Sequence, residues 1–400
     1  MPSRRDVLLG VGSAGLAASA GCLGSDDVEP GTDDSYGWTT GGADLRNSRA
    51  IPDGVAPREA PTLEWRADLE SVHATGEPIV TDETVLLTTG TDVVAFDRES
   101  GDRRWSIDPE NDAYSYRGAP TVVDGTAYVP EVGTLTARDV ETGDVEWSHD
   151  LEHVIGRGSL TVSDRGDDGH VFVAAGNVVS ALDARSGDRL WEREVFGSAR
   201  YGIAKYTDYL YVATSGGELS VIDMWGRPEW RRTLEAGIQS APTVLTPDDR
   251  RGGWGVAVVS GDGSVVSFDA GGSREWRTEL DGFGDDGLAI GHRTLLARSG
   301  STLFALDPDD GGHRWRVDLG ASSNNPPILV GDTVYVGGDR LRAIDVGGGI
   351  GVRSVRFGEQ RFEYETAGSI GYVTATDGKL FLTTNVAWDA DESAELIVLS

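Results

Sequence analysis

The chain has 400 residues, 38% of them hydrophobic and including 11 Trp, 11 Tyr and 9 Phe, so it can bury a sizeable core. Its formal charge of -31, from 66 acidic and 35 basic residues, disfavours binding to nucleic acid. The single cysteine excludes an intrachain disulfide framework and any site that needs two thiolates. Because the acidity is spread along the whole chain, we expect a surface adapted to molar salt, as in halophilic archaea.

Residues 1–21 resemble a twin-arginine export signal that ends in a lipobox. Arg4 and Arg5 precede a Gly/Ala-rich apolar run, and small residues lead up to Cys22. The run is too short and too weakly hydrophobic for a membrane-spanning helix, and its positive charge stands at the front, as in signal peptides. We therefore expect export through Arg4 and Arg5, cleavage before Cys22 and lipidation of its thiol, with a buried structural cysteine as the alternative.

The next stretch, residues 22–36, is acidic and contains Gly, Pro and Thr. This composition predicts a flexible tether. A protein anchored at Cys22 after export would then lie at the extracytoplasmic face of the cell membrane, attached through its lipid.

Tryptophan recurs along the rest of the chain at intervals of 40, 42, 44, 39, 46 and 39 residues. A fixed period of this size is typical of repeat architectures. Each tryptophan after the first follows an aspartate by seven or eight residues, at the end of an apolar strand. The repeated tryptophans are Trp65, Trp105, Trp147, Trp191, Trp230, Trp276 and Trp315.

Each repeat reads as four antiparallel strands. In residues 94–105, 136–147 and 180–191 the aspartate starts a turn and the glycine four residues later closes it, with the tryptophan on the strand that follows. Two shorter strands precede this hairpin, for example around Asp124-Gly125. Four strands in about 40 residues make one blade of a β-propeller. We expect the tryptophan to fill the gap between neighbouring blades and its indole N–H to find a backbone acceptor.

The string Ala-x-Asp-x-x-[Ser/Thr]-Gly-x-x-x-Trp resembles the repeat of the pyrroloquinoline-quinone-like β-propeller family, over residues 61–400. Within that family, a lipid-anchored propeller with little else attached most resembles the BamB-type lipoproteins, which have eight blades. Residues 37–60, which begin Gly37-Trp38, are similar to the leader segment that precedes the first blade in such export lipoproteins.

The repeat count predicts how the ring closes. Seven units are complete, and the last, Thr374 to Ser400, stops after three strands. Pro61 to Leu69 matches a tryptophan-bearing fourth strand and has no first three strands before it. The sequence therefore predicts an all-β, eight-bladed β-propeller with four antiparallel strands per blade, in which the N- and C-terminal strands complete the last blade. Because closure removes free sheet edges, we expect a monomer.

The resemblance raises a quinone cofactor, which the residues do not support. Quinoprotein alcohol dehydrogenases of this family use adjacent cysteines above the cofactor and a calcium held by Glu, Asn and Asp. With Cys22 carrying the lipid, no thiol remains in the propeller. Of the six histidines only His149 and His153 have metal-ligand spacing, and two histidines alone make a poor zinc site. The calcium-like run Asp307 to Gly312 coincides with a repeat turn. We expect no cofactor, no metal and no catalytic residue, so not an enzyme.

One set of residues points to a binding site. The residue three before the aligned first-strand position ends the loop that enters the central channel, and in three consecutive blades it is arginine. Gln239 takes this place in the next blade, and three tyrosines lie in the same loops. Arg and Tyr are favoured at interaction hot spots, although each Arg could instead pair with a nearby carboxylate. The candidate residues at this mouth are Arg117, Arg157, Arg200, Gln239, Tyr114, Tyr116 and Tyr201.

These observations predict a membrane-tethered extracellular scaffold that binds a protein or peptide partner through the mouth of the channel, without catalysis. Two alternatives remain open. One is a binding or sensor module for an anionic small molecule held by the arginines, and the other is a quinone-dependent dehydrogenase.

Overall fold

The computed structural model describes residues 28, 30–32, 37–108, 118–153, 155–163, 169–280, 282, 287–323, 325–352, 355–357, 360–388 and 391–400. Arg4, Arg5, Cys22, Tyr114, Tyr116 and Arg117 lie outside these residues, and so does the side chain of Arg157. No helix in the described part of the chain is long and apolar enough to cross a membrane.

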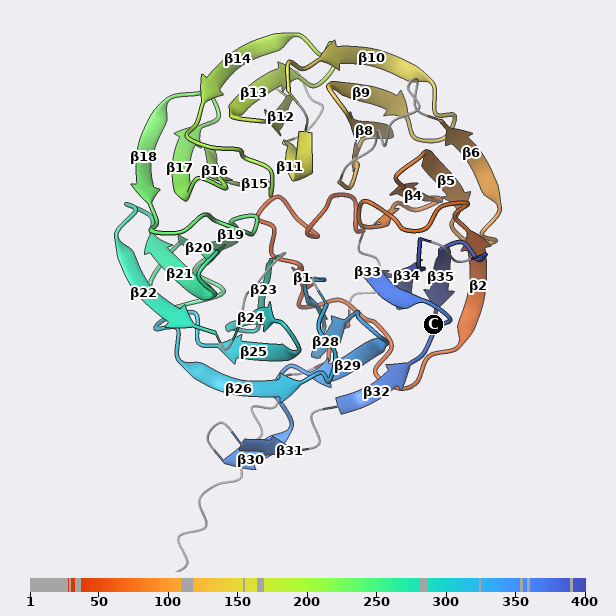
Figure 1. Ribbon diagram of the computed structural model, residues 1–400, viewed down its shortest axis with the longest axis vertical. Coiled ribbons are helices and arrows are strands. Elements are labelled where there is room, and N and C mark those ends of the chain that lie inside the picture. Colours follow the sequence, from red (N-terminus) through yellow and green to blue (C-terminus); the bar gives the residue numbers. More distant parts are fainter. Residues whose placement is uncertain are drawn as a thin grey trace, which may run out of the picture.

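Eight four-stranded antiparallel blades are arranged around a central channel, which confirms the predicted fold (Figure 1). The first four blades, from the inner to the outer strand, are β3 (Ile79–Val80), β4 (Thr84–Thr88), β5 (Val93–Asp97) and β6 (Arg103–Ile107); β7 (Thr121–Val123), β8 (Thr126–Glu131), β9 (Thr134–Asp139) and β10 (Val145–Asp150); β11 (Ile155–Val162), β12 (His170–Ala175), β13 (Val178–Asp183) and β14 (Arg189–Glu194); β15 (Ile203–Tyr206), β16 (Tyr209–Ala213), β17 (Glu218–Asp223) and β18 (Pro228–Thr233).

The other four blades follow the same order. They are β19 (Thr243–Leu245), β20 (Gly255–Ser260), β21 (Ser264–Asp269) and β22 (Arg274–Glu279); β23 (Leu288–Gly291), β24 (Thr294–Ser299), β25 (Thr302–Leu306) and β26 (His313–Asp318); β27 (Ile328–Val330), β28 (Thr333–Val336), β29 (Leu341–Asp345) and β32 (Gln360–Tyr364); β33 (Ser369–Thr376), β34 (Lys379–Asn385), β35 (Glu395–Leu399) and β2 (Leu63–Asp68). Blade 7 carries two additions, which are the parallel strand β1 (Ala50–Ile51) beside β27 and a hairpin of β30 (Ile350–Val352) and β31 (Val355–Phe357).

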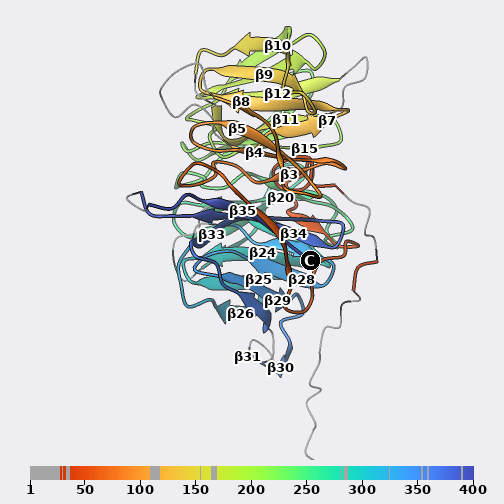
Figure 2. The same cartoon turned by 90° about the vertical axis from the view of Figure 1, so that its right-hand side faces the viewer.

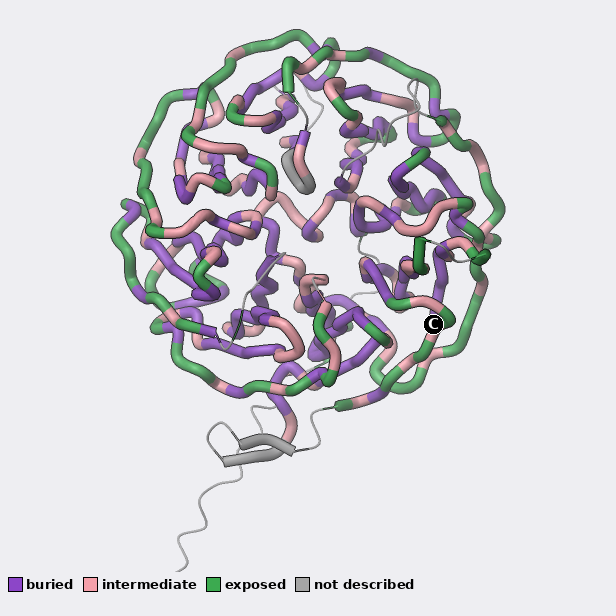
Figure 3. The backbone as a smooth tube through the Cα atoms, in the orientation of Figure 1, coloured by how far each residue is buried: buried purple, intermediate pink, exposed green. Residues whose placement is uncertain are grey.

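The ring closes as predicted. Strand β2 pairs antiparallel with β35, with Trp65 opposite Val398, so the N-terminal strand is the outer strand of the blade that holds the C-terminal strands. Middle strands such as β4 and β20 are wholly buried, whereas the outer strands are mostly exposed or half-buried, apart from a buried aromatic residue in β10, β22, β26 and β32 (Figure 3). The apolar side chains of the middle strands therefore form the core between blades.

The tryptophans join each blade to the next. All seven indole N–H groups donate to a backbone carbonyl in the third-to-fourth-strand turn of the following blade, at 2.8 to 3.1 Å. The glycine of that turn has a positive φ, and a Cβ there would lie 2.5 to 3.0 Å from the indole ring. Aspartate, glycine and tryptophan therefore recur together because each blade supplies the glycine turn on which the preceding tryptophan packs.

Phe362 of β32 takes the tryptophan position in blade 7, opposite Ala343 as Trp315 is opposite Ala305 in blade 6. The next blade, blade 8, takes its third strand from β35 and its fourth from β2, so no hairpin turn joins them. The carbonyl and glycine that accept an indole at the other seams are therefore missing from this one. Phenylalanine fits this position because its ring has no N–H group, whereas a buried indole N–H there would have no acceptor.

The leader segment, residues 37–60, runs inside the ring (Figure 1). In six blades, the backbone N–H two residues after the aligned first-strand position donates to a leader carbonyl. These pairs are Val80 to Trp38, Val122 to Thr39, Lys205 to Leu45, Val244 to Arg46, Ile290 to Ser48 and Leu329 to Arg49, at 2.6 to 3.0 Å. The leader thus fills the channel. Because the donor stands at the same offset in each of these six blades, the sequence alignment of their first strands is correct.

Candidate functional site

Figure 2 shows the ring from its side, so that its two faces lie at the left and the right of the view. We call upper the face formed by the loops between blades and by the turns between second and third strands. The lower face carries the hairpins between first and second and between third and fourth strands. The leader leaves on the lower side, where Gly331 N donates to Ile51 O at 3.0 Å and Gly378 N donates to Val55 O at 3.1 Å.

One buried carboxylate holds the leader in place. Glu77, only 4% exposed, accepts hydrogen bonds from the indole N–H of Trp38 at 3.2 Å and from the Gly42 amide at 2.9 Å, and it pairs with Arg49. Arg49 itself has a positive φ, as do Ala43 and Asn47 nearby. Such strained residues persist only where their surroundings fix them, so the leader has one well-defined path.

Above the leader, a cavity of about 80 Å³ remains on the channel axis. Leader residues such as Asp44 and Arg49 line it together with residues from seven of the eight blades, among them Tyr201 and Tyr372. Ligand pockets for cofactor-sized molecules usually measure about 300 Å³ or more. The axial cavity therefore suits water or a small ion rather than a large ligand.

Two residues of the arginine arc, Arg200 and Gln239, are described with their side chains. Arg200 is exposed, its guanidinium carbon lies 5.0 Å from the ring centroid of Tyr201, and none of the described carboxylates pairs with it. Gln239 is half-buried. A Cβ on Gly156 of blade 3 would lie 2.3 Å from the Cα of Arg200, so the loop ends of blades 3 and 4 meet in space as the alignment predicted.

Two exposed aromatic side chains on the upper face were missed by the sequence analysis. Phe196, in the loop between blades 3 and 4, is 67% exposed, and Trp388, between the second and third strands of blade 8, is 72% exposed. Phe196 lies four residues before Arg200 in the same loop. The sequence does contain a signal for them, because each is a large apolar residue that lies outside the strands of the repeat and is therefore not expected in the core.

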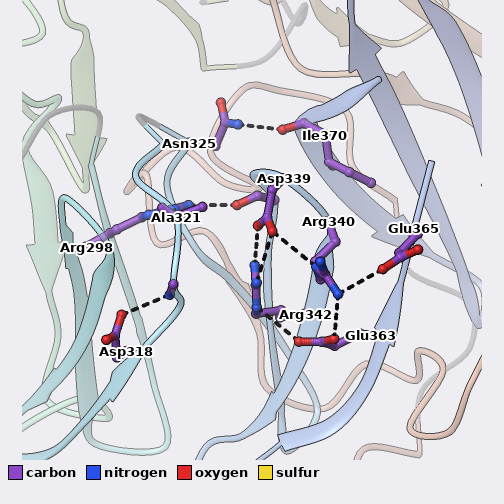
Figure 4. Close-up of polar contacts among 12 residues, drawn as sticks. Arg298, Asp318, Ala321, Asn325, Asp339, Arg340, Arg342, Glu363, Glu365 and Ile370 are labelled. Carbon is purple, nitrogen blue, oxygen red and sulfur yellow. Dashed lines mark hydrogen bonds and ion pairs between the residues drawn. The ribbon is translucent and has the colours of Figure 1, made fainter. Parts of the chain in front are cut away.

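A larger hollow, of about 590 Å³, lies on the upper face where the loops of blades 6, 7 and 8 meet (Figure 4). We call it the blade 7–8 hollow. Its polar lining residues are His73, Ser322, Ser323, Asn325, Asp339, Ser369, Tyr372 and Asn385.

Charged side chains organise the loops around this hollow. Arg298 is 4% exposed and donates to the carbonyls of Gly337 at 2.7 Å, Ala321 at 3.0 Å and Gly300 at 3.2 Å. Burial lowers the pKa of Arg298 to about 10, with Arg342 adding to this effect. Hydrogen bonds from Arg342, and then from Arg340, lower the pKa of Asp339 to about 2, so this carboxylate stays ionised at neutral pH.

The described residues do not fit a pyrroloquinoline quinone with its calcium. That cofactor is a rigid tricarboxylate, which needs several basic side chains and a carboxylate-rich metal site. The axial cavity is too small for it, and the hollow is lined by no described Arg or Lys. Among the described residues, no group of three or more His, Cys, Asp or Glu could hold a metal ion.

Comparison with solved structures shows the same fold. The chain matches the quinohemoprotein alcohol dehydrogenase of Comamonas testosteroni with a TM-score of 0.74 and 15% identity, over 92% of this chain and 81% of that one. It matches BamB of Moraxella catarrhalis with a TM-score of 0.63 and 19% identity, over 85% and 98%. For a europium-containing methanol dehydrogenase the values are 0.71 and 12%, over 92% and 98%.

Sequence comparison identifies the family, which the structural matches at 12–19% identity do not. A search of curated proteins found no significant match. The family model described as outer membrane protein assembly factor BamB matches residues 59–204 and 174–393, which together include every blade strand except β35. The chain therefore belongs to the BamB family of pyrroloquinoline-quinone-like repeat β-propellers.

Proposed function

We propose that this chain is a membrane-tethered, extracytoplasmic scaffold that binds a protein or peptide partner through its upper face and catalyses no reaction. The observation that carries the proposal is the grouping of Phe196, Arg200 and Tyr201 on that face. Phe196 is 67% exposed, and the half-buried ring of Tyr201 lies beside Arg200, which has no carboxylate partner among the described residues. Aromatic side chains and an arginine in one loop have the composition of an interaction hot spot.

The attachment of the N-terminal segment supports the use of this face. Thr32 N donates to Asp53 O at 2.9 Å, and Val28 packs against the core of blades 6 and 7 beside the lower-face hairpin of His292. Val28 is six residues from Cys22, a span of at most about 20 Å when extended. A lipid on Cys22 would hold the lower face near the membrane and leave the upper face free.

The net charge of -31 also suits a protein that works in molar salt, where repulsion between surface charges is screened within about 3 Å.

A small anion bound by the arginines is the second candidate, since Arg200 has no carboxylate partner among the described residues. Guanidinium groups from adjacent loop ends could hold a polyanion bidentately. Dialysis separates the two candidates, because a small anion is lost from the purified protein and a protein partner trapped by cross-linking is retained.

Replacing Arg117, Arg157 and Arg200 together by serine is expected to abolish partner capture and to leave stability nearly unchanged. Exposed ion pairs contribute about 0–1 kcal/mol each, whereas a hot-spot arginine costs about 2 kcal/mol or more of binding energy when truncated. Cross-linked adducts formed in intact cells and the thermal midpoint of the purified variant measure the two effects. A variant that loses stability but keeps its adducts would show that the arginines are structural.

A further inference from the structure

We propose that the blade 7–8 hollow is a binding site for a neutral sugar residue. The hollow lies beside blades 6, 7 and 8, away from the Arg200 loop of blade 4, so the proposal is independent of protein binding at that loop. With about 590 Å³, its volume falls within the range of about 300–1,000 Å³ that is usual for small-ligand sites.

The walls of the hollow are held in place before any ligand arrives. Arg298 ties the loop at Ala321 to the loop at Gly337, although it has no carboxylate partner among the described residues (Figure 4). Asn325 Nδ2 donates to Ile370 O at 2.8 Å, which links these loops to blade 8. A buried guanidinium bound only to carbonyls costs free energy, and the rigid loops that result lower the entropy cost of binding.

The lining is almost uncharged, in contrast to the rest of the molecule. A quarter of the chain is Asp, Glu, Lys or Arg, yet Asp339 is the only such residue among the described residues that line the hollow. Its carboxylate already accepts from Arg342 Nη1 at 2.7 Å and from Arg340 Nε at 3.1 Å. The Asp339 carboxylate is therefore already paired and not available to a cationic ligand, and none of the described lining residues is an Arg or Lys that could bind an anionic ligand. The lining selects a neutral ligand.

Two amide side chains of the lining keep polar atoms available for a ligand. Among the described residues, the amide of Asn385 and the Oδ1 atom of Asn325 have no hydrogen-bond partner, and both side chains line the hollow. A Cβ on Gly371 would lie 3.1 Å from Asn385 Nδ2, so the glycine leaves room for this amide. Amide and hydroxyl groups that donate and accept match sugar hydroxyls, which do both.

The shape and the rings of the hollow also favour a sugar over a peptide. Loops of blades 6, 7 and 8 border it, and the edge of β33 that reaches it is already occupied at Ile370, whose N–H donates to Gly338 O at 2.6 Å and whose carbonyl accepts from Asn325 Nδ2 at 2.8 Å. The rings of Tyr372 and His73 supply flat apolar surfaces for the C–H face of a pyranose. A compact polyhydroxylated ring therefore fits the hollow better than a main chain does.

Saturation-transfer NMR on the purified chain with maltose, cellobiose and N,N′-diacetylchitobiose, and with a uronic-acid disaccharide and an uncharged tetrapeptide as comparisons, tests the site. We expect at least one neutral disaccharide to bind. Asn385→Ala should weaken it about tenfold, as expected when an amide that makes one or two hydrogen bonds is lost. Asn177→Ala, on an exposed turn of the upper face in blade 3, is the matched control and should leave binding unchanged.

Ser322→Trp provides a second variant, because Ser322 is exposed and a large ring there would fill the hollow without disturbing the core. The variant should abolish sugar binding and keep the cross-linked adducts, whereas the triple arginine variant should do the reverse. The proposal is wrong if no neutral disaccharide binds, if the acidic disaccharide or the peptide binds better, or if Asn385→Ala and Ser322→Trp bind as wild type does.

Discussion

Replacing Trp315 by alanine is expected to lower the free energy of unfolding by about 3–5 kcal/mol, the usual cost of truncating a buried large aromatic side chain. Trp315 is 1% exposed, and its indole N–H donates to Val346 O at 3.0 Å across the seam between blades 6 and 7. The variant loses both the buried ring and the hydrogen bond. The shift of the urea unfolding curve measures the change.

Trp225→Ala is the matched control, because Trp225 lies on a lower-face turn and is 53% exposed. It should cost less than about 1 kcal/mol. Trp315→Phe should fall between the two, since the ring stays while Val346 O loses its donor. Equal losses from Trp315→Ala and Trp225→Ala would contradict the role assigned to the repeated tryptophans.

The second large effect is expected from Glu77→Ala. Removing this carboxylate leaves Arg49 buried without its partner and takes an acceptor from Trp38 and Gly42. Breaking a buried ion pair on one side costs about 3–5 kcal/mol. We expect the leader to leave the channel first, so limited proteolysis should cut the variant within residues 37–60 while the blades stay resistant.

Glu83→Ala is the control for this variant, because the Glu83 side chain is 71% exposed and lies 3.7 Å from Arg104 at the surface. It should change stability by less than about 1 kcal/mol. Replacing Glu77 by leucine and Arg49 by methionine together should recover part of the loss, since no buried charge is then left alone. Wild-type protease resistance in Glu77→Ala would show that the carboxylate does not hold the leader.

The blades and their closure could be predicted because their determinants are local and repeated. The aspartate, the glycine and the tryptophan of one repeat lie within a dozen residues, and each has a conformational reason visible in the sequence. Closure followed from counting strands, since the Trp65 strand lacked a blade of its own and the last blade lacked a fourth strand. Both conclusions agree with the strand pairing.

The position of the leader could not be predicted in the same way. Its contacts with six blades use backbone carbonyls, which no side-chain pattern reports. The partner of Arg49 is Glu77, in the loop before the first blade, and neither residue belongs to the repeat. The one side chain that indicates burial of this segment in the sequence is Trp38, a large aromatic residue outside the repeat spacing.

The candidate site was partly predictable. Aligning the first strands brought Arg200 and the blade 3 loop together correctly, because the loop ends follow the symmetry of the ring. The blade 7–8 hollow was missed, since Asn325, Asp339 and Asn385 occupy different places in loops of unequal length. Arg298 ties together the loops at Ala321 and Gly337, near Asn325 and Asp339, and its three carbonyl acceptors are set by the tertiary structure.

Site-specific photo-cross-linking in intact cells tests most directly whether the upper face binds a protein partner. A photoreactive residue at position 196 lies on the upper face, and one at position 225 lies on the lower face, both at exposed aromatic positions. We expect one or more discrete protein adducts from position 196 that disappear in the Arg200→Ser background, and none of these adducts from position 225. The same adducts from both positions, or adducts from position 225 alone, would contradict binding through the upper face.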